Sequence, residues 1–179
     1  MSRKKDNERG APLVVESFSV RRDDKGALKG EITLVNRGAR TIQAYGSVRG
    51  LLFDPATKLL TVLLSDQRLL GVQHASHFLL PRAVAVDPGG KRLVEVPLPE
   101  VITRLTPGPD PRAPALTTIP LSQAETAEVE VAWSEQPFYR DPRDQKGDMR
   151  EQFLRWPQGF AVSRFPVAIP SGEATATRG

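Results

Sequence analysis

The stretch LKGEITLVNRGARTIQAYGSVRGLLF, residues 28–53, decides the fold class of this chain. At its start the side chains alternate: one face carries Leu28, Gly30, Ile32 and Leu34, and the other carries Lys29, Glu31 and Thr33. Such a period of two is typical of a strand with one face in a core, because successive strand side chains point to opposite faces of a sheet. The first predicted strand covers residues 28–36, and an Asn-Arg-Gly turn leads from it into a second predicted strand over residues 41–53. The stretch therefore predicts an antiparallel sheet.

More strands are predicted on both sides of this stretch, each bounded by turn residues. They cover residues 13–21, 58–66, 76–86, 91–96, 127–133 and 160–169. Pro81 and Pro166 place two of them at sheet edges, since proline cannot donate to a sheet ladder. Short strands at this spacing, separated by Gly and Pro turns, are the pattern of a β-sandwich. We therefore predict a mainly β protein, an antiparallel sandwich of seven to nine strands.

The order of the predicted elements resembles that of immunoglobulin-like and fibronectin-III-like domains over residues 13–133. The step Val35-Asn36-Arg37-Gly38 between two strands is also similar to that of adhesion-type and late-embryogenesis-type sandwiches. The resemblance implies an Ig-like sandwich. It implies no activity, because one fold supports many unrelated functions.

The chain is expected to form one domain over residues 11–169, between a disordered basic arm at 1–10 and a disordered tail at 170–179. Residues 97–120 hold seven prolines, a density that predicts a stiff, extended loop or spacer. The alternative is a docking site for a proline-recognising groove.

Residues 134–160 form a segment rich in aromatic residues and arginine. A capping-box pattern begins at Asp148, and Met149, Phe153 and Trp156 follow at helical spacing, which predicts a short helix over 148–156. Trp, Tyr and Arg dominate binding hot spots, because they bury large areas. We predict partner-binding residues at Tyr139, Arg140, Arg155 and Trp156. The alternative is that the helix only buries its apolar face against the end of the sandwich.

Composition narrows the function classes. The net charge is +4, and half of it lies in residues 1–10, so no basic stripe of the kind used by dedicated nucleic-acid binders is evident. The absence of cysteine excludes disulfides, thiolate catalysis and Cys-based zinc sites, and is compatible with a reducing cytoplasm. No apolar run approaches the roughly 20 residues that span a bilayer, and no apolar segment follows the charged start as in a secretory signal. We therefore expect a soluble, cytoplasmic protein that does not enter membranes.

Catalytic and metal-binding motifs are not found. His74 and His77 are the only histidines, and strand spacing would place them on opposite faces, whereas a metal site needs three or four converging ligands. The sequence has no G-x-S-x-G elbow, Walker loop or G-x-G-x-x-G motif. We predict no catalytic residue, no metal ligand and no cofactor.

The leading hypothesis is a non-enzymatic interaction protein or accessory subunit. It would bind another protein subunit through the aromatic segment, or through an exposed sheet edge. One alternative is an enzyme with a carboxylate- or His-containing site at the end of the sandwich. The other is a weak nucleic-acid binder that uses the arm at 1–10, an option that the balanced charge disfavours.

Overall fold

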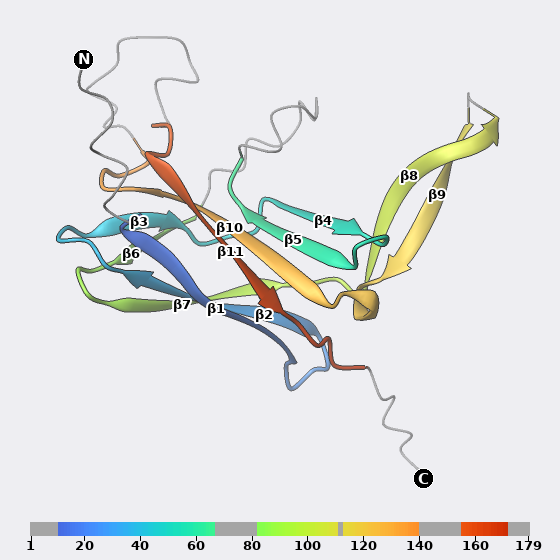
Figure 1. Ribbon diagram of the computed structural model, residues 1–179, viewed down its shortest axis with the longest axis horizontal. Helices are drawn as coiled ribbons and strands as arrows, with labels where there is room; N and C mark the ends of the chain where they lie inside the picture. The colour runs from blue at the N-terminus through green and yellow to red at the C-terminus, as the bar shows by residue number, and fades with distance from the viewer. Residues whose placement is uncertain (1–10, 67–81, 111–112, 140–154, 172–179) are drawn as a thin grey trace.

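The computed structural model describes residues 11–66, 82–110, 113–139 and 155–171. These residues are mainly β, as predicted, and nearly all of their strand pairs are antiparallel (Figure 1). They form two larger sheets, which we call sheet A and sheet B, and a two-stranded ribbon.

Sheet A has three strands in the order β1-β2-β7: β1 (Leu13–Arg22), β2 (Leu28–Asn36) and β7 (Lys91–Pro97). Strand β2 covers the range that the alternating pattern predicts, and every second side chain along it is buried. Both of its neighbours pair with it antiparallel. Strand β1 is therefore an edge strand, with one side bonded to β2.

Sheet B has six strands: β3 (Ile42–Tyr45), β4 (Gly50–Asp54), β5 (Leu59–Leu64), β6 (Ala83–Val86), β10 (Thr126–Ser134) and β11 (Gly159–Pro166). Strand β10 is central. It pairs with β5 in parallel on one side and with β11 antiparallel on the other, and its last residues reach β3. Strand β11 pairs only with β10, so it is an edge strand of sheet B.

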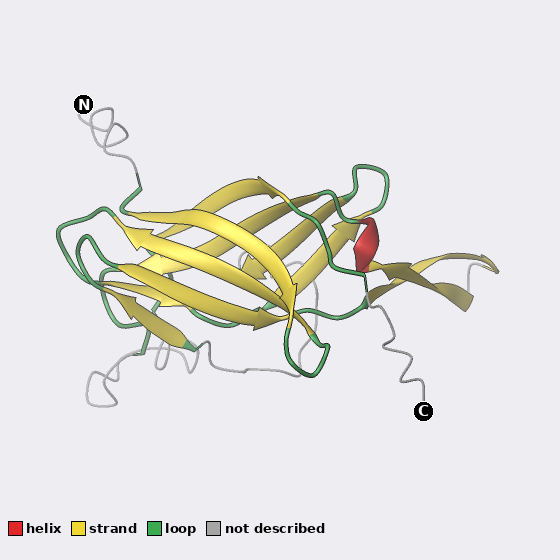
Figure 2. Cartoon of the chain, turned by 90° about the horizontal axis from the view of Figure 1, so that it is seen from below, coloured by secondary structure: helices red, strands yellow, loops and turns green. Residues whose placement is uncertain are grey.

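The two sheets enclose one apolar core (Figure 2). Ile32 and Leu34 of sheet A and Val62, Val129 and Val131 of sheet B are fully shielded from water. Burial of a side chain of this size contributes about 1.5–3 kcal/mol. The core therefore fixes how the two sheets face each other.

The predicted strand over residues 41–53 is two strands in the structure, β3 and β4. The chain breaks at Gly46, whose backbone N–H donates to Arg82 O at 2.6 Å. A Cβ at Gly46 would lie 2.6 Å from Val84 Cγ1, so only glycine allows this close approach. The break sends β3 to one end of β10 and β4 to the outer side of β5.

The proline-rich segment also differs from its prediction as a loop. It contains β8 (Val101–Asp110) and β9 (Ala113–Pro120), which pair antiparallel and project from the body as a ribbon (Figures 1 and 2). In a ribbon of two strands each strand has an unpaired side, and proline is tolerated where its missing N–H would face solvent. A 3-10 helix, η3 (Leu121–Gln123), follows the ribbon.

The predicted helix over 148–156 lies outside the described residues except for Arg155 and Trp156, and these two are not helical. Of the strand predicted over 76–86, the described part contains β6. The predicted arm at 1–10 and residues 172–179 of the tail also lie outside the described ranges. Within the described ranges, no helix has the length and apolar character needed to span a membrane.

Candidate interaction surface

Tyr139 and Trp156, two of the four predicted binding residues, lie at the surface between β10 and β11. Their exposed fractions are 39% and 67%. The backbone of Arg155 donates to Phe138 O at 2.7 Å, so the chain before β11 runs beside the chain after β10. Arg155 Nη1 also donates to Pro137 O at 3.2 Å. Arg140 lies outside the described residues.

Phe138, the residue before Tyr139, is anchored in the core. It is fully buried, and its ring meets the ring of Tyr45 edge to face, with centroids 4.7 Å apart. Burial raises the pKa of Tyr45 to about 12, and the nearby Asp66 carboxylate acts in the same direction. Because Phe138 points inward, the next residue, Tyr139, is carried to the exposed side. We call the exposed pair Tyr139 and Trp156 the aromatic surface.

The start of β11 is held close to β10 by a glycine. A Cβ at Gly159 would lie 2.7 Å from Trp133 Cζ2, so the indole occupies the place of a side chain there. The backbone N–H of Gln158 donates to Trp133 O at 2.9 Å, and Gln158 Oε1 accepts from the backbone N–H of Glu135 at 2.5 Å. These contacts fix the path of the chain from Trp156 into β11.

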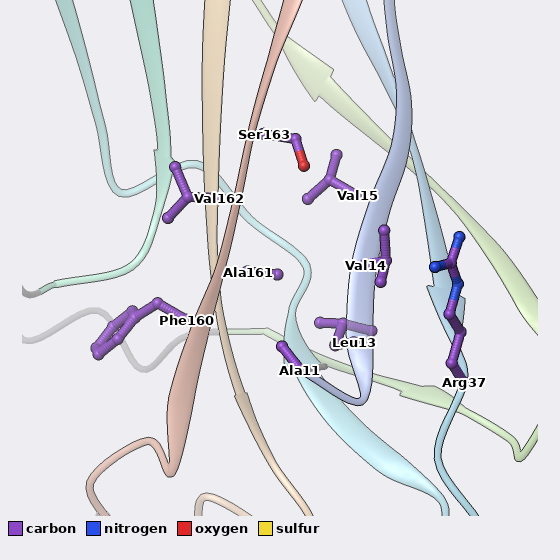
Figure 3. A pocket seen from close by; sticks show the side chains of 9 residues that line it. All are labelled: Ala11, Leu13, Val14, Val15, Arg37, Phe160, Ala161, Val162 and Ser163. Carbon is purple, nitrogen blue, oxygen red and sulfur yellow. The ribbon is translucent and has the colours of Figure 1, made fainter. Parts of the chain in front are cut away.

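A groove lies between the two edge strands β1 and β11 (Figure 3). We call it the edge groove; it is open to solvent and has a volume of about 670 Å³. Its lining consists of Ala11, Leu13, Val14, Val15, Arg37, Phe160, Ala161, Val162 and Ser163. Ala161 and Ser163 point toward β1, while Phe160 and Val162 point to the other side of β11 (Figure 3).

Strands β1 and β11 run in the same direction along this groove. Their first residues line it together, and at their other ends Arg22 of β1 bonds to Pro170 O, just beyond β11. The two strands draw apart toward their first residues (Figure 3). The groove therefore has a wide end, at the start of both strands, and a narrow end.

On β1, the pattern of hydrogen bonds to β2 shows which backbone groups are left on the free edge of the strand. The N–H of Arg37 donates to Pro12 O at 2.7 Å, whereas the N–H of Asn36 donates away from β1, to Gly90 O at 3.1 Å. Bonded and non-bonded pairs alternate in an antiparallel ladder. The pair of Leu13 with Asn36 is therefore non-bonded, and so is the pair two residues on. The backbone N–H and C=O groups of Leu13 and Val15 consequently point away from β2.

The same reasoning applies to β11. The N–H of Val167 donates to Glu125 O at 2.9 Å, which makes the odd-numbered residues of β11 the ones bonded to β10. Ala161 is therefore bonded to β10. Phe160 and Val162 direct their backbone N–H and C=O groups away from it, to the open edge. The free edges of β1 and β11 thus carry backbone donors and acceptors that no described strand bonds.

Arg37 stands at the mouth of the wide end. Asn36 positions it: the buried Asn36 side chain donates to Arg40 O at 2.7 Å and to Val86 O at 2.8 Å, and it accepts from the N–H of Gly38 at 2.8 Å. This network fixes the turn between β2 and β3. The Arg37 side chain is exposed, and no hydrogen bond or ion pair joins its guanidinium to another residue that the structure describes.

The other candidate groups have structural roles or fall outside the described ranges. Asp66 pairs with Arg49, Nε to Oδ1, at 2.7 Å, and Asp87 accepts from Thr41 Oγ1 at 3.2 Å. His74 and His77 lie outside the described residues. Among the described residues, no three His, Cys, Asp or Glu side chains gather as a metal site would require.

Of the predicted site residues, Tyr139 and Trp156 thus form the aromatic surface, Arg155 precedes Trp156 in the chain, and Arg140 lies outside the described residues. The reasoning from sequence missed the edge groove, because it depends on two strands far apart in the chain. One signal was present: Pro12 and Pro166 flank strands β1 and β11, as expected at sheet edges.

Comparisons with known proteins add no assignment. No protein-family model matches the chain. Searches of curated proteins and of solved structures likewise gave no match.

Proposed function

We propose that this protein is a non-enzymatic interaction protein or accessory subunit that binds another protein through the aromatic surface. The observation that carries the proposal is Trp156, a tryptophan that is 67% exposed and follows Arg155, whose backbone bonds to Phe138 O next to the exposed Tyr139. Tryptophan and tyrosine supply much of the energy of protein interfaces, because they bury a large area at a small cost in side-chain entropy.

The surface around Trp156 supports the same proposal. Val162 on β11 is 48% exposed, and Phe160 between them is half-buried, so apolar side chains continue from the aromatic surface along the outer face of β11. Arg155 is positioned by its bond to Pro137 O and lies next to Trp156. An apolar strip beside a positioned arginine is the composition expected of the centre of a protein interface.

The charge distribution favours a protein partner over nucleic acid. Five of the described arginines are already in ion pairs: Arg21, Arg22, Arg40, Arg49 and Arg164. A nucleic-acid interface needs cations that are free to pair with phosphates. Paired guanidinium groups are less suited to that purpose.

We also propose that sheets A and B form an immunoglobulin-like or fibronectin-III-like sandwich. The support is that the antiparallel sheet A and the mostly antiparallel sheet B face each other over one core. The parallel pair β5–β10 and the β8–β9 ribbon are additions to that plan. A cytoplasmic location stays a prediction from the cysteine-free sequence, which cell fractionation would test.

The test is capture of partners by the tagged full chain from its native cells, with quantitative mass spectrometry. The variants are Trp156→Ala and, as matched control, Leu93→Ala, which removes a 55% exposed side chain from β7. We expect Trp156→Ala to lose a stoichiometric partner by at least about tenfold, as hot-spot truncation does, and Leu93→Ala to keep it. Retention of every partner by Trp156→Ala would show that this surface is not the binding site.

A further inference from the structure

The β8–β9 ribbon has one face that the body of the protein leaves uncovered. The register pairs Ile102 with Ile119 and, one step on, Thr103 with Thr118, so these two pairs lie on opposite faces. Ile119 is buried and Ile102 packs against the core, so their face meets the body at the base of the ribbon. On the opposite face, which we call the ribbon face, the described side chains are all exposed: Val101, Thr103, Leu116, Thr118 and Pro120.

The ribbon face is apolar and lacks a layer to pack against. Leu116 is 71% exposed, more than any other large apolar side chain in the described part of the chain, and Val101 is 42% exposed. Two paired strands are at best marginally stable in water unless an apolar face packs on another layer. Because the ribbon projects from the body, the described residues supply no such layer along its outer part (Figure 2). A second molecule can supply it.

The free edges of the ribbon are unsuited to the addition of another strand. Prolines occur in both strands: Pro107 and Pro109 in β8, and Pro114 and Pro120 in β9. The N–H of Leu121 donates to Glu100 O at 2.9 Å, so by alternation Pro120 and Pro114 stand where an N–H would point outward from β9. Proline at an edge opposes pairing with another chain. A second molecule would therefore meet the face of the ribbon rather than its edges.

The ribbon face is suited to a second copy of itself. A two-fold axis brings a residue next to its own copy, so a charge near the axis would meet a like charge. The described side chains of the ribbon face carry no charge. Leu116 pairs with Leu105, the fifth of the ten residues of β8, and so lies midway along the ribbon. An axis at this point sets Leu116 against its own copy, with two ribbons antiparallel and fully overlapped.

The size of the ribbon face predicts how tightly two copies associate. Ten residues of strand are about 34 Å long and two strands are about 10 Å wide, so the overlapped faces together cover roughly 700 Å². Stable complexes bury about 1,200–2,000 Å². The contact is therefore expected to give a weak dimer whose population depends on protein concentration.

We propose that the ribbon face joins two copies of this chain in a two-fold dimer with antiparallel ribbons, centred on Leu116. Strand β10 begins after the ribbon and η3 and ends before the aromatic surface, which places the two surfaces about 30 Å apart (Figure 1). The dimer would therefore carry an aromatic surface at each of its far ends. The dimer goes beyond the proposed function, and only this bivalent display rests on it.

Sedimentation equilibrium of the full chain tests the dimer. We expect a reversible monomer–dimer equilibrium with a Kd of about 10–100 μM, measured at up to about 500 μM. Leu116→Asp should weaken it at least about tenfold, because two carboxylates would meet at the axis. The matched control is Leu93→Asp, at a 55% exposed position on β7, which should leave the Kd unchanged. A monomer at the highest concentration, or a dimer that Leu116→Asp does not weaken, would overturn the proposal.

The absence of cysteine from the sequence allows a direct test of the axis. In Leu116→Cys a disulfide can form only between two copies, and it requires Cα atoms within about 7 Å of each other. We expect Leu116→Cys to form a disulfide-linked dimer at least about tenfold faster than Leu93→Cys at equal protein concentration. Equal rates would overturn the two-fold arrangement.

The dimer and the proposed function fail separately. Trp156→Ala should lose the cellular partner and keep the Kd of the dimer. Leu116→Asp should still bind the partner in solution but dissociate faster from a surface that carries many partner molecules, because two linked sites hold such a surface longer than one. If Trp156→Ala keeps every partner, the proposed function is wrong and the dimer stands. If Leu116→Asp dissociates from that surface as slowly as wild type, the bivalent display is wrong.

Discussion

Strands β1 and β11 lie side by side, and we call the boundary between them the seam. Its narrow end and its wide end each have an arginine, and the two arginines differ in their bonded partners. At the narrow end, Arg22 donates from Nε and Nη2 to Pro170 O, at 3.2 and 2.9 Å, and so ties β1 to the chain that follows β11. At the wide end, Arg37 borders the groove without a partner among the described residues. One guanidinium joins the two strands, and the other has no bonded partner in the described part of the chain.

The comparison shows that the opening is local. Arg22 also donates to Gly26 O and to Glu100 Oε1, both at 2.6 Å, so one side chain joins three segments at the narrow end. A guanidinium can do so because it carries five donors in a fixed fork. The groove thus lies between strands that are firmly joined at one end.

The largest change in the free energy of unfolding is expected from a substitution in the core beneath the seam. Phe18 of β1 is 6% exposed and packs against Gly30 of β2. We expect Phe18→Ala to lower the free energy of unfolding by about 3–5 kcal/mol, because it leaves a cavity. Val162→Ala, at a half-exposed position on β11, should change it by less than about 0.5 kcal/mol. Urea unfolding measures both, and equal effects would mean that β1 is not a core strand.

A smaller loss of unfolding free energy is expected from a substitution at the wide end of the groove. Gly159→Ala places a Cβ where the Trp133 indole now lies, so we expect a loss of about 1–3 kcal/mol from overpacking. The control is Gly159→Ala combined with Trp133→Leu, which should recover part of the loss relative to Trp133→Leu alone. If Gly159→Ala is neutral by urea unfolding, the close approach of β11 to Trp133 is incorrect.

Substitution of each arginine tests the difference between the two ends directly. Arg22→Ala should lower the thermal midpoint of unfolding, whereas Arg37→Ala should leave it unchanged, because the Arg37 side chain bonds to no residue that the structure describes. Arg22 lowers the pKa of Glu100 from its ordinary value of 4.5, so its contribution is present above that pH and declines as the pH falls below it. The difference between wild type and Arg22→Ala should therefore shrink in acid. Calorimetry at pH 7 and pH 3 checks both points, and a larger loss for Arg37→Ala would reverse the assignment of the two ends.

The smallest expected effect concerns Tyr45, beneath the aromatic surface. Its pKa is raised from 10.0 to about 12, so the folded state keeps a proton that the unfolded state loses between these values. The resulting stability is fully present below pH 10 and is lost as the pH rises toward 12. Urea midpoints at pH 9 and pH 11 should therefore fall more for wild type than for Tyr45→Phe. Parallel curves for the two proteins would contradict the buried position of the hydroxyl.

The alternation of apolar and polar side chains was sufficient to predict the strands in which it is clear. The boundaries of β2 match the prediction, and β7 and β10 differ from theirs by one residue at one or both ends. The signal is strong there because one side of each strand faces the core. Gly46 and Gly50 indicated a bulge or a close backbone approach within the strand predicted over 41–53. That the strand divides at Gly46 was not predicted, because the break depends on the approach of Val84, a contact between distant parts of the chain.

Two further features depended on pairing that no local pattern reveals. The prolines of residues 97–120 were interpreted as a barrier to regular structure, yet they lie in β8 and β9, where each strand has an unpaired side. The edge groove requires β1 and β11 to lie side by side, although they are the first and last strands described. The aromatic segment was located by composition alone, which does not show that Phe138 is buried while Tyr139 and Trp156 are exposed.

The central position of β10 has a consequence for how the chain is made. Sheet A is complete once Pro97 has left the ribosome, whereas β5 must wait for β10, and β10 for β11, before sheet B is closed. Pairing between such distant segments is slow compared with hairpin formation. During synthesis the edges of β3 and β5 that pair with β10 therefore stay exposed until β10 has been made.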